Sequence, residues 1–207
     1  DAMAGDRATR SGDFAWRDRR TASDVAGKSA LIMGFGRIGQ RVGALCRALG
    51  LRVAAFDPYM ERSPVEGVEM VKDFRAILPE TDFLCLHLPS TPETRDLIGA
   101  GELALLKRGA FVLNCARGGI VDEDVLCDAL ESGHLGGAGL DVFAKEPPDT
   151  AHRLFRQEKV LLSPHNAALT EECAIRMATQ AVQNVLDCLD GKLQPRVVMN
   201  RREIGMA

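Results

Sequence analysis

Short β-rich runs alternate with helical segments from Ser29 onward, and this alternation constrains the fold more than any other feature of the sequence. The runs are apolar throughout, which is typical of parallel strands covered on both faces. We predict strands at residues 30–33, 52–56, 68–71, 83–87, 110–114, 137–141 and 160–162. The pattern indicates an α/β fold, a doubly wound parallel sheet of about seven strands with helices on both faces.

Three amphipathic helices have recognisable start and stop residues between these runs. The first ends before Gly50, and the second begins after Asp122 as N-cap and ends before Gly133. The last begins near Thr170 and ends before Gly191. The face of the first helix that we expect to pack on the sheet consists of Ile38, Val42, Leu45, Cys46 and Leu49.

Three glycines, Gly34, Gly36 and Gly39, follow the first predicted strand and open the first helix. In a GxGxxG loop they permit a tight turn, a close approach of a diphosphate to the backbone, and tight packing of helix on strand. The free N–H groups and the dipole of the helix N-terminus favour negative charge there. The motif is weak alone, but its position between strand and helix predicts a Rossmann-like dinucleotide site.

Asp57 ends the second predicted strand, roughly 20 residues after the glycines, where a carboxylate accepts hydrogen bonds from adenosine ribose hydroxyls. The same charge repels a 2′-phosphate, so we expect NAD to be preferred over NADP. The alternative is that Asp57 only caps the turn before Pro58.

Four ionisable residues lie at or after the ends of later strands: Arg117, Asp141, Glu146 and His165. The ligand crevice of an open parallel sheet lies outside these carboxyl ends. An arginine fork can hold a carboxylate, a histidine can take a hydroxyl proton near neutral pH, and a glutamate can fix the histidine tautomer. Individually, each could instead be an ordinary loop or surface residue.

The overall charge gives no reason to expect nucleic acid or a membrane as a partner, because 26 Lys+Arg oppose 29 Asp+Glu. No apolar run is long enough to span a bilayer. The six cysteines form no CxxC pair and no metal-ligand spacing, so we expect free thiols, no metal site and a cytoplasmic location.

Several stretches resemble the D-isomer-specific 2-hydroxyacid dehydrogenases, a family that includes phosphoglycerate dehydrogenase and the hydroxypyruvate and glyoxylate reductases. The matching stretches are GFGRIGQ, FDPY, HLPSTPETRDLI, GAFVLNCARGGIVDEDVL, GLDVFAKEPP and SPHNAA. They extend over most of residues 27–191. The resemblance implies NAD as cofactor, a small 2-hydroxy or 2-oxo acid as substrate, and a homodimer formed through the NAD-binding domain.

The resemblance also implies a catalytic trio of Arg117, Glu146 and His165. Around the glycine loop and Asp57 it implies NAD contacts at Arg37, Ile38, Leu88, Pro89, Cys115, Ala116, Arg117, Asp141, His165, Asn166 and Ala167. Asn166 and Ala167 stand where many relatives have a hydrophobic residue and a glycine.

We therefore expect residues 1–26 to form a connector and dimer arm, 27–191 the NAD-binding domain, and 192–207 the return to a missing substrate domain. The sequence does not identify the hydroxy acid. Alone, the 207-residue chain is expected to bind NAD(H) without useful turnover. The alternative is an NAD(H)-binding scaffold, because the C-terminal-binding-protein corepressors resemble the same family and largely retain the trio.

Overall fold

The computed structural model describes residues 2–19, 22–198, 200 and 203–204. It divides into two compact units, residues 1–164 and 165–207, which are described separately. Asp1 and residues 20–21 of the predicted arm lie outside the described residues, as do 199, 201–202 and 205–207 of the predicted return segment.

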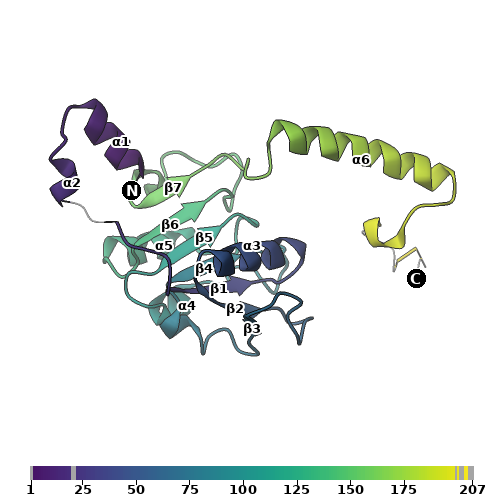
Figure 1. The fold of residues 1–207 in the computed structure, drawn as a ribbon, viewed down its shortest axis with the longest axis horizontal. Helices are drawn as coiled ribbons and strands as arrows, with labels where there is room; N and C mark the ends of the chain where they lie inside the picture. Colours follow the sequence, from purple (N-terminus) through teal and green to yellow (C-terminus); the bar gives the residue numbers. More distant parts are fainter. Residues whose placement is uncertain (1, 20–21, 199, 201–202, 205–207) are drawn as a thin grey trace. The chain divides into compact units, whose positions relative to one another are not determined.

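The first unit contains a seven-stranded sheet in the order β3-β2-β1-β4-β5-β6-β7 (Figure 1). Every neighbouring pair of strands is parallel. The strands are β1 (Ser29–Met33), β2 (Arg52–Phe56), β3 (Val68–Met70), β4 (Phe83–Leu86), β5 (Phe111–Asn114), β6 (Gly137–Leu140) and β7 (Val160–Leu162). Each boundary lies within one residue of its predicted position, so the α/β prediction is confirmed.

Helices cover both faces of this sheet, as alternate residues of β1 show. Leu31 and Met33 belong to one core cluster, which includes residues of α4 (Ala100–Leu105) and α5 (Glu123–Glu131). Ala30 and Ile32 belong to the other, which packs against α3 (Arg37–Ala48). Two short 3-10 helices, η1 (Leu78–Glu80) and η2 (Arg153–Arg156), complete the connections.

The predicted packing face of α3 is wrong in part. Ile38, Leu45 and Leu49 are exposed, and Ile38 retains 70% of its accessible surface. The buried positions of α3 are instead Gly39 and Gly43. A methyl group at Gly39 would stand 2.1 Å from the Gly34 carbonyl oxygen, just after β1, and 3.3 Å from the Ile32 side chain. Small residues therefore form the closest part of the contact face, and Val42 and Cys46 pack beside them.

The helix ends agree with the sequence. The Asp122 carboxylate accepts hydrogen bonds from the backbone N–H groups of Asp124 and Val125, as an N-cap should. In the second unit, Thr170 is the N-cap of α6 (Glu171–Leu189), and its hydroxyl accepts a hydrogen bond from the Cys173 N–H.

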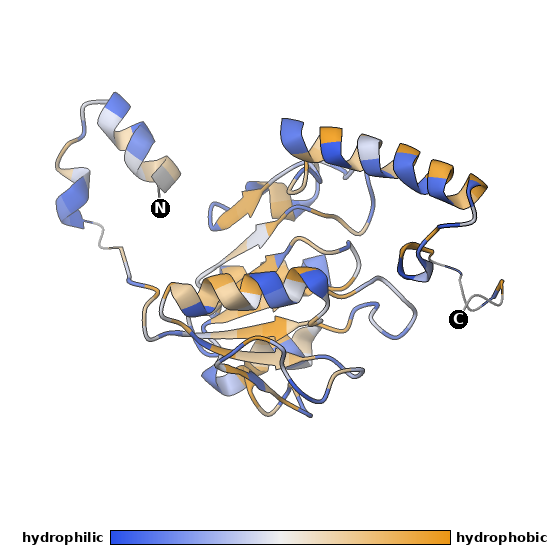
Figure 2. Cartoon of the chain, turned by 45° about the vertical axis from the view of Figure 1, so that its right-hand side comes forward, coloured by the Kyte–Doolittle hydropathy of each residue, from blue (hydrophilic) through white to orange (hydrophobic). Residues whose placement is uncertain are grey.

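The face of β5 and β7 that lies on the α3 side of the sheet is less covered than the rest. Phe111, Leu113 and Leu161 remain exposed there. Figure 2 shows apolar residues along the strands, and alternating polar and apolar residues along α6. None of the described residues of α6 is buried, and the 3-10 helix η3 (Pro195–Val197) follows it.

The residues before the sheet form two helices, α1 (Ala2–Arg10) and α2 (Trp16–Arg19). The Trp16 ring lies within 3.4 Å of the position of a Cβ added at Gly5, so the two helices pack on each other. Whether this segment connects to a further domain or forms a dimer arm stays a prediction.

Candidate functional site

The glycine loop joins β1 to α3, and the three glycines differ in their surroundings. Gly34 has a φ of +85°, and a Cβ there would lie 2.6 Å from the His87 carbonyl oxygen. A Cβ at Gly39 would meet the Gly34 carbonyl. At Gly36 no atom lies within 4 Å of an added Cβ, so that side of the loop has room for a ligand.

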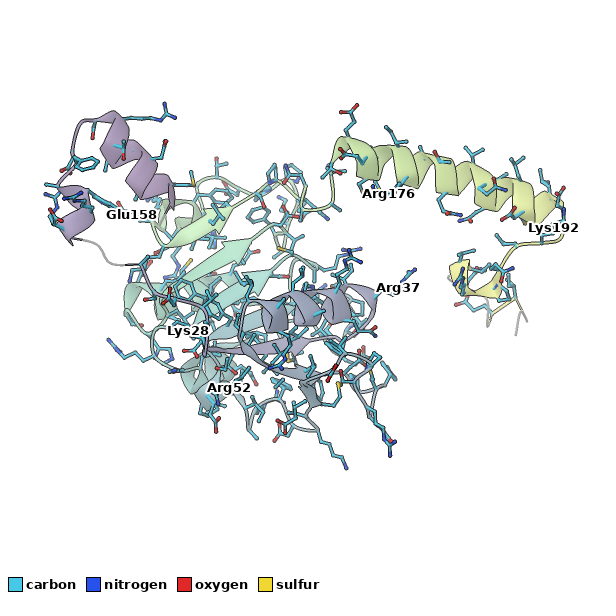
Figure 3. The ribbon with its side chains drawn as sticks, viewed as in Figure 1. Lys28, Arg37, Arg52, Glu158, Arg176 and Lys192 are labelled. Atoms are coloured by element: carbon cyan, nitrogen blue, oxygen red, sulfur yellow. The ribbon has the colours of Figure 1, made fainter. Side chains whose placement is uncertain are left out.

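The N-terminus of α3 has no side-chain cap. Gly36 is the N-cap residue, and no acidic residue occupies the first turn. Arg37 begins the helix, and its side chain extends from the carboxyl end of the sheet, opposite Lys28 and Arg52 (Figure 3). Uncapped N–H groups, the helix dipole and a cation together suit a diphosphate.

Asp57 links the end of β2 to the glycine loop. One carboxylate oxygen accepts from the Phe35 N–H at 2.8 Å, and the other from the Tyr59 N–H at 2.9 Å. The bond from the Tyr59 N–H is the turn cap that the sequence offered as the alternative role of Asp57. The two roles are compatible, because each carboxylate oxygen has two lone pairs and can also accept from a ribose hydroxyl.

Leu88 and Pro89 follow β4 on the other side of β1. Leu88 is buried, and its side chain is 3.1 Å from the position of a Cβ at Gly34, whereas Pro89 is exposed. The preceding His87 has a buried Nε2 without a hydrogen-bond partner, and burial lowers the pKa of its ring.

Asn114, at the end of β5, holds the following loop and was missed by the sequence analysis. It is 2% exposed; its Nδ2 donates to the Arg117 carbonyl at 3.0 Å, and its Oδ1 accepts from the Ala116 N–H at 3.1 Å. An amide at the last position of an apolar strand was the available signal, because Asn commonly bonds to nearby backbone groups.

Within this loop Arg117 is exposed, and its Nη1 donates to the Ala116 carbonyl at 2.6 Å. Cys115 is exposed as a residue, but its thiol is partly buried. This partial burial raises the pKa of the thiol, and the nearby Asp141 carboxylate adds to the effect. Gly118 permits close contact with the next loop, because a Cβ there would lie 1.7 Å from the Phe143 carbonyl oxygen.

The loop after β6 contains Glu146. Its Oε1 accepts from the Phe143 N–H at 3.1 Å, while Glu123 at the start of α5 accepts from the Ala144 N–H at 2.6 Å. Since β5 and β6 are parallel neighbours, Arg117 and Glu146 follow the same edge of the sheet.

Asp141 is buried, with 2% of its surface exposed. Its Oδ1 accepts from the Ser163 hydroxyl at 2.5 Å, which ties the ends of β6 and β7 together. Its predicted contact with the nicotinamide stays a prediction.

His165, Asn166 and Ala167 belong to the second unit, and all three are exposed. His165 has a φ of +51°, a left-handed conformation that is uncommon outside glycine and often found at functional positions. The structure thus brings Arg117 and Glu146 to one edge, and the complete trio stays a prediction.

Within the described parts of the chain, no group of three or more His, Cys, Asp or Glu side chains could hold a metal ion, and no helix is long and apolar enough to cross a membrane. The uncapped helix, the open side at Gly36 and the Asp57 carboxylate all fit a dinucleotide. Arg37 adds positive charge at the uncapped helix start, and the Asp57 carboxylate has lone pairs left to accept from ribose hydroxyls, whereas the predicted contacts of the other residues stay predictions.

Comparison with known proteins gives a consistent match. A family model described as "D-isomer specific 2-hydroxyacid dehydrogenase, NAD binding domain" matches residues 1–167. The D-3-phosphoglycerate dehydrogenase of Methanocaldococcus jannaschii is 39% identical over 184 residues, covering 88% of this chain and 35% of that protein. The enzyme of the same name from Mycobacterium leprae is 42% identical over 184 residues, covering 88% and 34%.

Among solved structures, D-lactate dehydrogenase from Aquifex aeolicus, complexed with NAD and lactic acid, matches with a TM-score of 0.82 at 27% identity. The match covers 90% of this chain and 61% of that one. The chain spans about a third of the length of the two phosphoglycerate dehydrogenases that it matches.

Proposed function

This chain belongs to the D-isomer specific 2-hydroxyacid dehydrogenase family, through its NAD-binding domain, and from that membership we propose that the whole protein is an NAD-dependent oxidoreductase. Its substrate in this proposal is a D-2-hydroxy acid or the matching 2-oxo acid, of the phosphoglycerate, hydroxypyruvate or glyoxylate type. The cofactor, when bound, would supply the redox chemistry: NAD+ would accept the hydride in oxidation and NADH would donate it in reduction.

The observation that carries the proposal is the common edge of the sheet. The glycine loop after β1 and Asp57 after β2 suit the dinucleotide, while Arg117 and Glu146 follow β5 and β6 at the same carboxyl edge. A cofactor and an acid substrate must meet for hydride transfer, and an open parallel sheet binds ligands at this edge.

Each residue of the trio has one task in this proposal. Arg117 holds the substrate carboxylate through its planar guanidinium. His165 takes the proton of the 2-hydroxyl during oxidation and returns it during reduction. Glu146 accepts a hydrogen bond from the other ring nitrogen of His165 and fixes its tautomer.

Turnover by the full-length protein tests these roles. With NADH and a panel of 2-oxo acids, His165→Ala is expected to lower kcat by about 10²–10⁴, the usual contribution of general acid–base catalysis, with little change in NADH affinity. Arg117→Ala should chiefly raise KM for the oxo acid. An active His165→Ala enzyme would remove this residue from the mechanism, and inactivity of the unmodified protein on every acid would favour an NAD(H)-binding scaffold.

The remaining proposals concern the setting. Residues 27–191 form the NAD-binding domain in this proposal, with 1–26 as connector and 192–207 as the return to a substrate domain. Cytoplasmic location is supported by the six free cysteines. A homodimer through the NAD-binding domain is consistent with the exposed Leu45 on α3 and Leu49 at its C-cap, and sedimentation of the full-length protein tests it.

A further inference from the structure

Three polar side chains are buried in the described part of the chain, and two of them lie at the carboxyl ends of neighbouring strands. Asn114 ends β5 and Asp141 follows β6, and each retains 2% of its accessible surface; the third is Thr81, before β4. Burying an amide or a carboxylate costs free energy unless its polar atoms are hydrogen-bonded. The hydrogen bonds of Asn114 and Asp141 therefore show what these two side chains hold in place.

A series of hydrogen bonds joins the carboxyl ends of β5, β6 and β7, which are neighbours in the sheet (Figure 1). The Asn114 Nδ2 donates to the Arg117 carbonyl at 3.0 Å, and the Asn114 carbonyl accepts from the Asp141 N–H at 3.0 Å. The Asp141 Oδ1 accepts from the Ser163 hydroxyl at 2.5 Å, and the Ser163 N–H donates to the Leu140 carbonyl at 3.0 Å. The three strand ends are therefore fixed to one another by polar contacts.

Both ends of this series stand next to a residue of the proposed trio. Arg117 follows Asn114 by three residues, and the Asn114 Oδ1 also accepts from the Ala116 N–H at 3.1 Å, so one amide holds the backbone on both sides of the Ala116–Arg117 peptide. Ser163 precedes His165 by two residues and fixes the point at which the chain leaves β7. One end of the series thus controls the backbone of Arg117, and the other controls the segment that leads to His165.

Stability alone does not require polar side chains at these positions. Apolar side chains of similar size would fill the strand ends without a cost of polar burial, and such replacements are often neutral or stabilising. A fully hydrogen-bonded polar group instead specifies a single local geometry. A site for a small acid needs this precision, because a misplacement of about 1 Å can lower a rate about 10²-fold.

We propose that Asn114 and Ser163 are positioning residues of the 2-hydroxyacid site, joined through Asp141, and that each acts through one member of the trio. Asn114 orients Arg117 toward the substrate carboxylate. Ser163 sets the position of His165 relative to the 2-hydroxyl. The inference rests on the proposed function of the trio, and neither Asn114 nor Ser163 contacts the substrate.

The first experiment measures whether Asn114 acts through Arg117. In the full-length protein, Asn114→Ala is expected to raise KM for the preferred 2-oxo acid about tenfold, since a misdirected guanidinium holds the carboxylate less well. The effect on NADH affinity should be smaller, because the glycine loop is untouched. In an Arg117→Ala background, Asn114→Ala should leave KM unchanged, since the group that it orients is already absent. A side chain that only stabilises the fold would lower Tm without this dependence on Arg117.

The second experiment applies the same logic to Ser163. Ser163→Ala is expected to lower kcat about tenfold with little change in the oxo-acid KM, because the misplaced residue is the one that moves the proton. In a His165→Ala background, assayed at high enzyme concentration, Ser163→Ala should not lower kcat further. Ser163→Thr keeps the hydroxyl that donates to the carboxylate and should retain most of kcat.

The matched control is Thr81→Val, which removes the hydroxyl of the third buried polar residue. This hydroxyl donates to the Ile77 carbonyl at 2.9 Å, near the amino end of β4. Its loss should lower Tm and leave kcat and KM unchanged. Steady-state kinetics with NADH and the oxo acid, calorimetric titration with NADH, and thermal unfolding are measured for every variant.

Each outcome decides one part of the proposal. An Asn114→Ala enzyme with an unchanged KM, or with an equal rise in KM whether or not Arg117 is present, would overturn the role of Asn114. If this variant does not fold, Asn114→Ser replaces it, because a hydroxyl can still accept from the Ala116 N–H but is too short to reach the Arg117 carbonyl. An unchanged kcat in Ser163→Ala, or an equal loss of kcat with and without His165, would overturn the role of Ser163.

Failure of the proposed function is a separate result that needs no variant. If the unmodified full-length protein bound NADH and reduced no 2-oxo acid, the trio would have no catalytic role and the positioning roles would fail with it. If the unmodified protein is active and the substitutions are additive, only the positioning roles are wrong.

Discussion

At the amino end of the sheet, the Asp82 carboxylate binds the Lys107 ammonium, whereas at the carboxyl end Arg37 and Arg117 are exposed. Asp82, before β4, accepts from the Ser29 N–H and hydroxyl at 3.0 Å and from the Lys107 ammonium at 2.7 Å. Arg37 and Arg117, at the carboxyl end, are exposed. The same parallel sheet thus separates a stabilising end from a binding end.

The difference follows from chain geometry. Strands enter the sheet at the amino end, where short side chains such as Ser29 and Asp82 can join neighbouring strands directly. At the carboxyl end the strands lead into loops and a helix N-terminus, whose N–H groups point away from the sheet. Polar residues at the amino end should therefore affect stability, and residues at the carboxyl end should affect binding.

The glycine loop gives the largest expected effect. Gly39→Ala places a methyl group 2.1 Å from the Gly34 carbonyl and should lower the free energy of unfolding by about 3 kcal/mol.

At Gly36 an added methyl group meets no atom within 4 Å, so Gly36→Ala should lower the free energy of unfolding by about 1 kcal/mol or less. The same substitution should weaken NADH binding at least about tenfold, because the backbone can no longer approach the diphosphate. Urea unfolding and calorimetry measure the two effects.

A Gly36→Ala variant with normal NADH affinity would contradict the binding role of this loop. A stable Gly39→Ala variant would instead show that α3 can move away from β1 at little cost.

The amino end gives the next effect. Asp82→Ala leaves the partly buried Ser29 N–H and the Lys107 ammonium without their partner, and should lower stability by about 1–3 kcal/mol without changing NADH affinity. Burial tends to raise the pKa of Asp82, but its hydrogen bonds to Lys107 and Ser29 outweigh this, and the pKa is lowered. A lowered carboxyl pKa contributes stability above the unfolded value of about 3.9, and this is lost as the pH falls through the folded pKa.

The stability difference between the unmodified chain and Asp82→Ala should therefore shrink in acid, as thermal unfolding between pH 7 and pH 3 can show. Loss of NADH affinity in folded Asp82→Ala would mean that the two ends are coupled.

His87, after β4 at the carboxyl end, gives the smallest expected effect on stability. Its buried Nε2 has no hydrogen-bond partner, whereas the Asp82 carboxylate at the amino end is paired. Burial lowers the pKa of the His87 ring, so the unfolded chain binds the proton more tightly. Stability should be full above the unfolded value of about 6.5 and decrease as the pH falls towards the folded pKa. His87→Gln should lose less thermal stability than the unmodified chain between pH 7 and pH 5.5; an identical decrease in both would exclude His87 as a source of acid sensitivity.

Local patterns determined most of the fold. The apolar runs located all seven strands, and Asp122 and Thr170 marked helix starts, because capping and strand burial depend on neighbours in sequence. The GxGxxG spacing and Asp57 also predicted the turn between β1 and α3 that the structure contains, and Asp57 accepts from the Phe35 N–H within this turn.

Tertiary structure decided what depends on distances between distant segments. Apolar periodicity predicted Ile38, Val42, Leu45, Cys46 and Leu49 as the packing face of α3. Val42 and Cys46 do pack against the core, whereas the other three are exposed. The buried positions of the helix are Gly39 and Gly43, because close approach requires the absence of side chains. A cavity beside Asp57 likewise combines the β2 loop with Lys72 after β3. By itself, the sequence determined which residues follow the carboxyl ends of the strands. Which of these residues line one cavity was decided by the pairing of β3 with β2, a contact that no local pattern encodes.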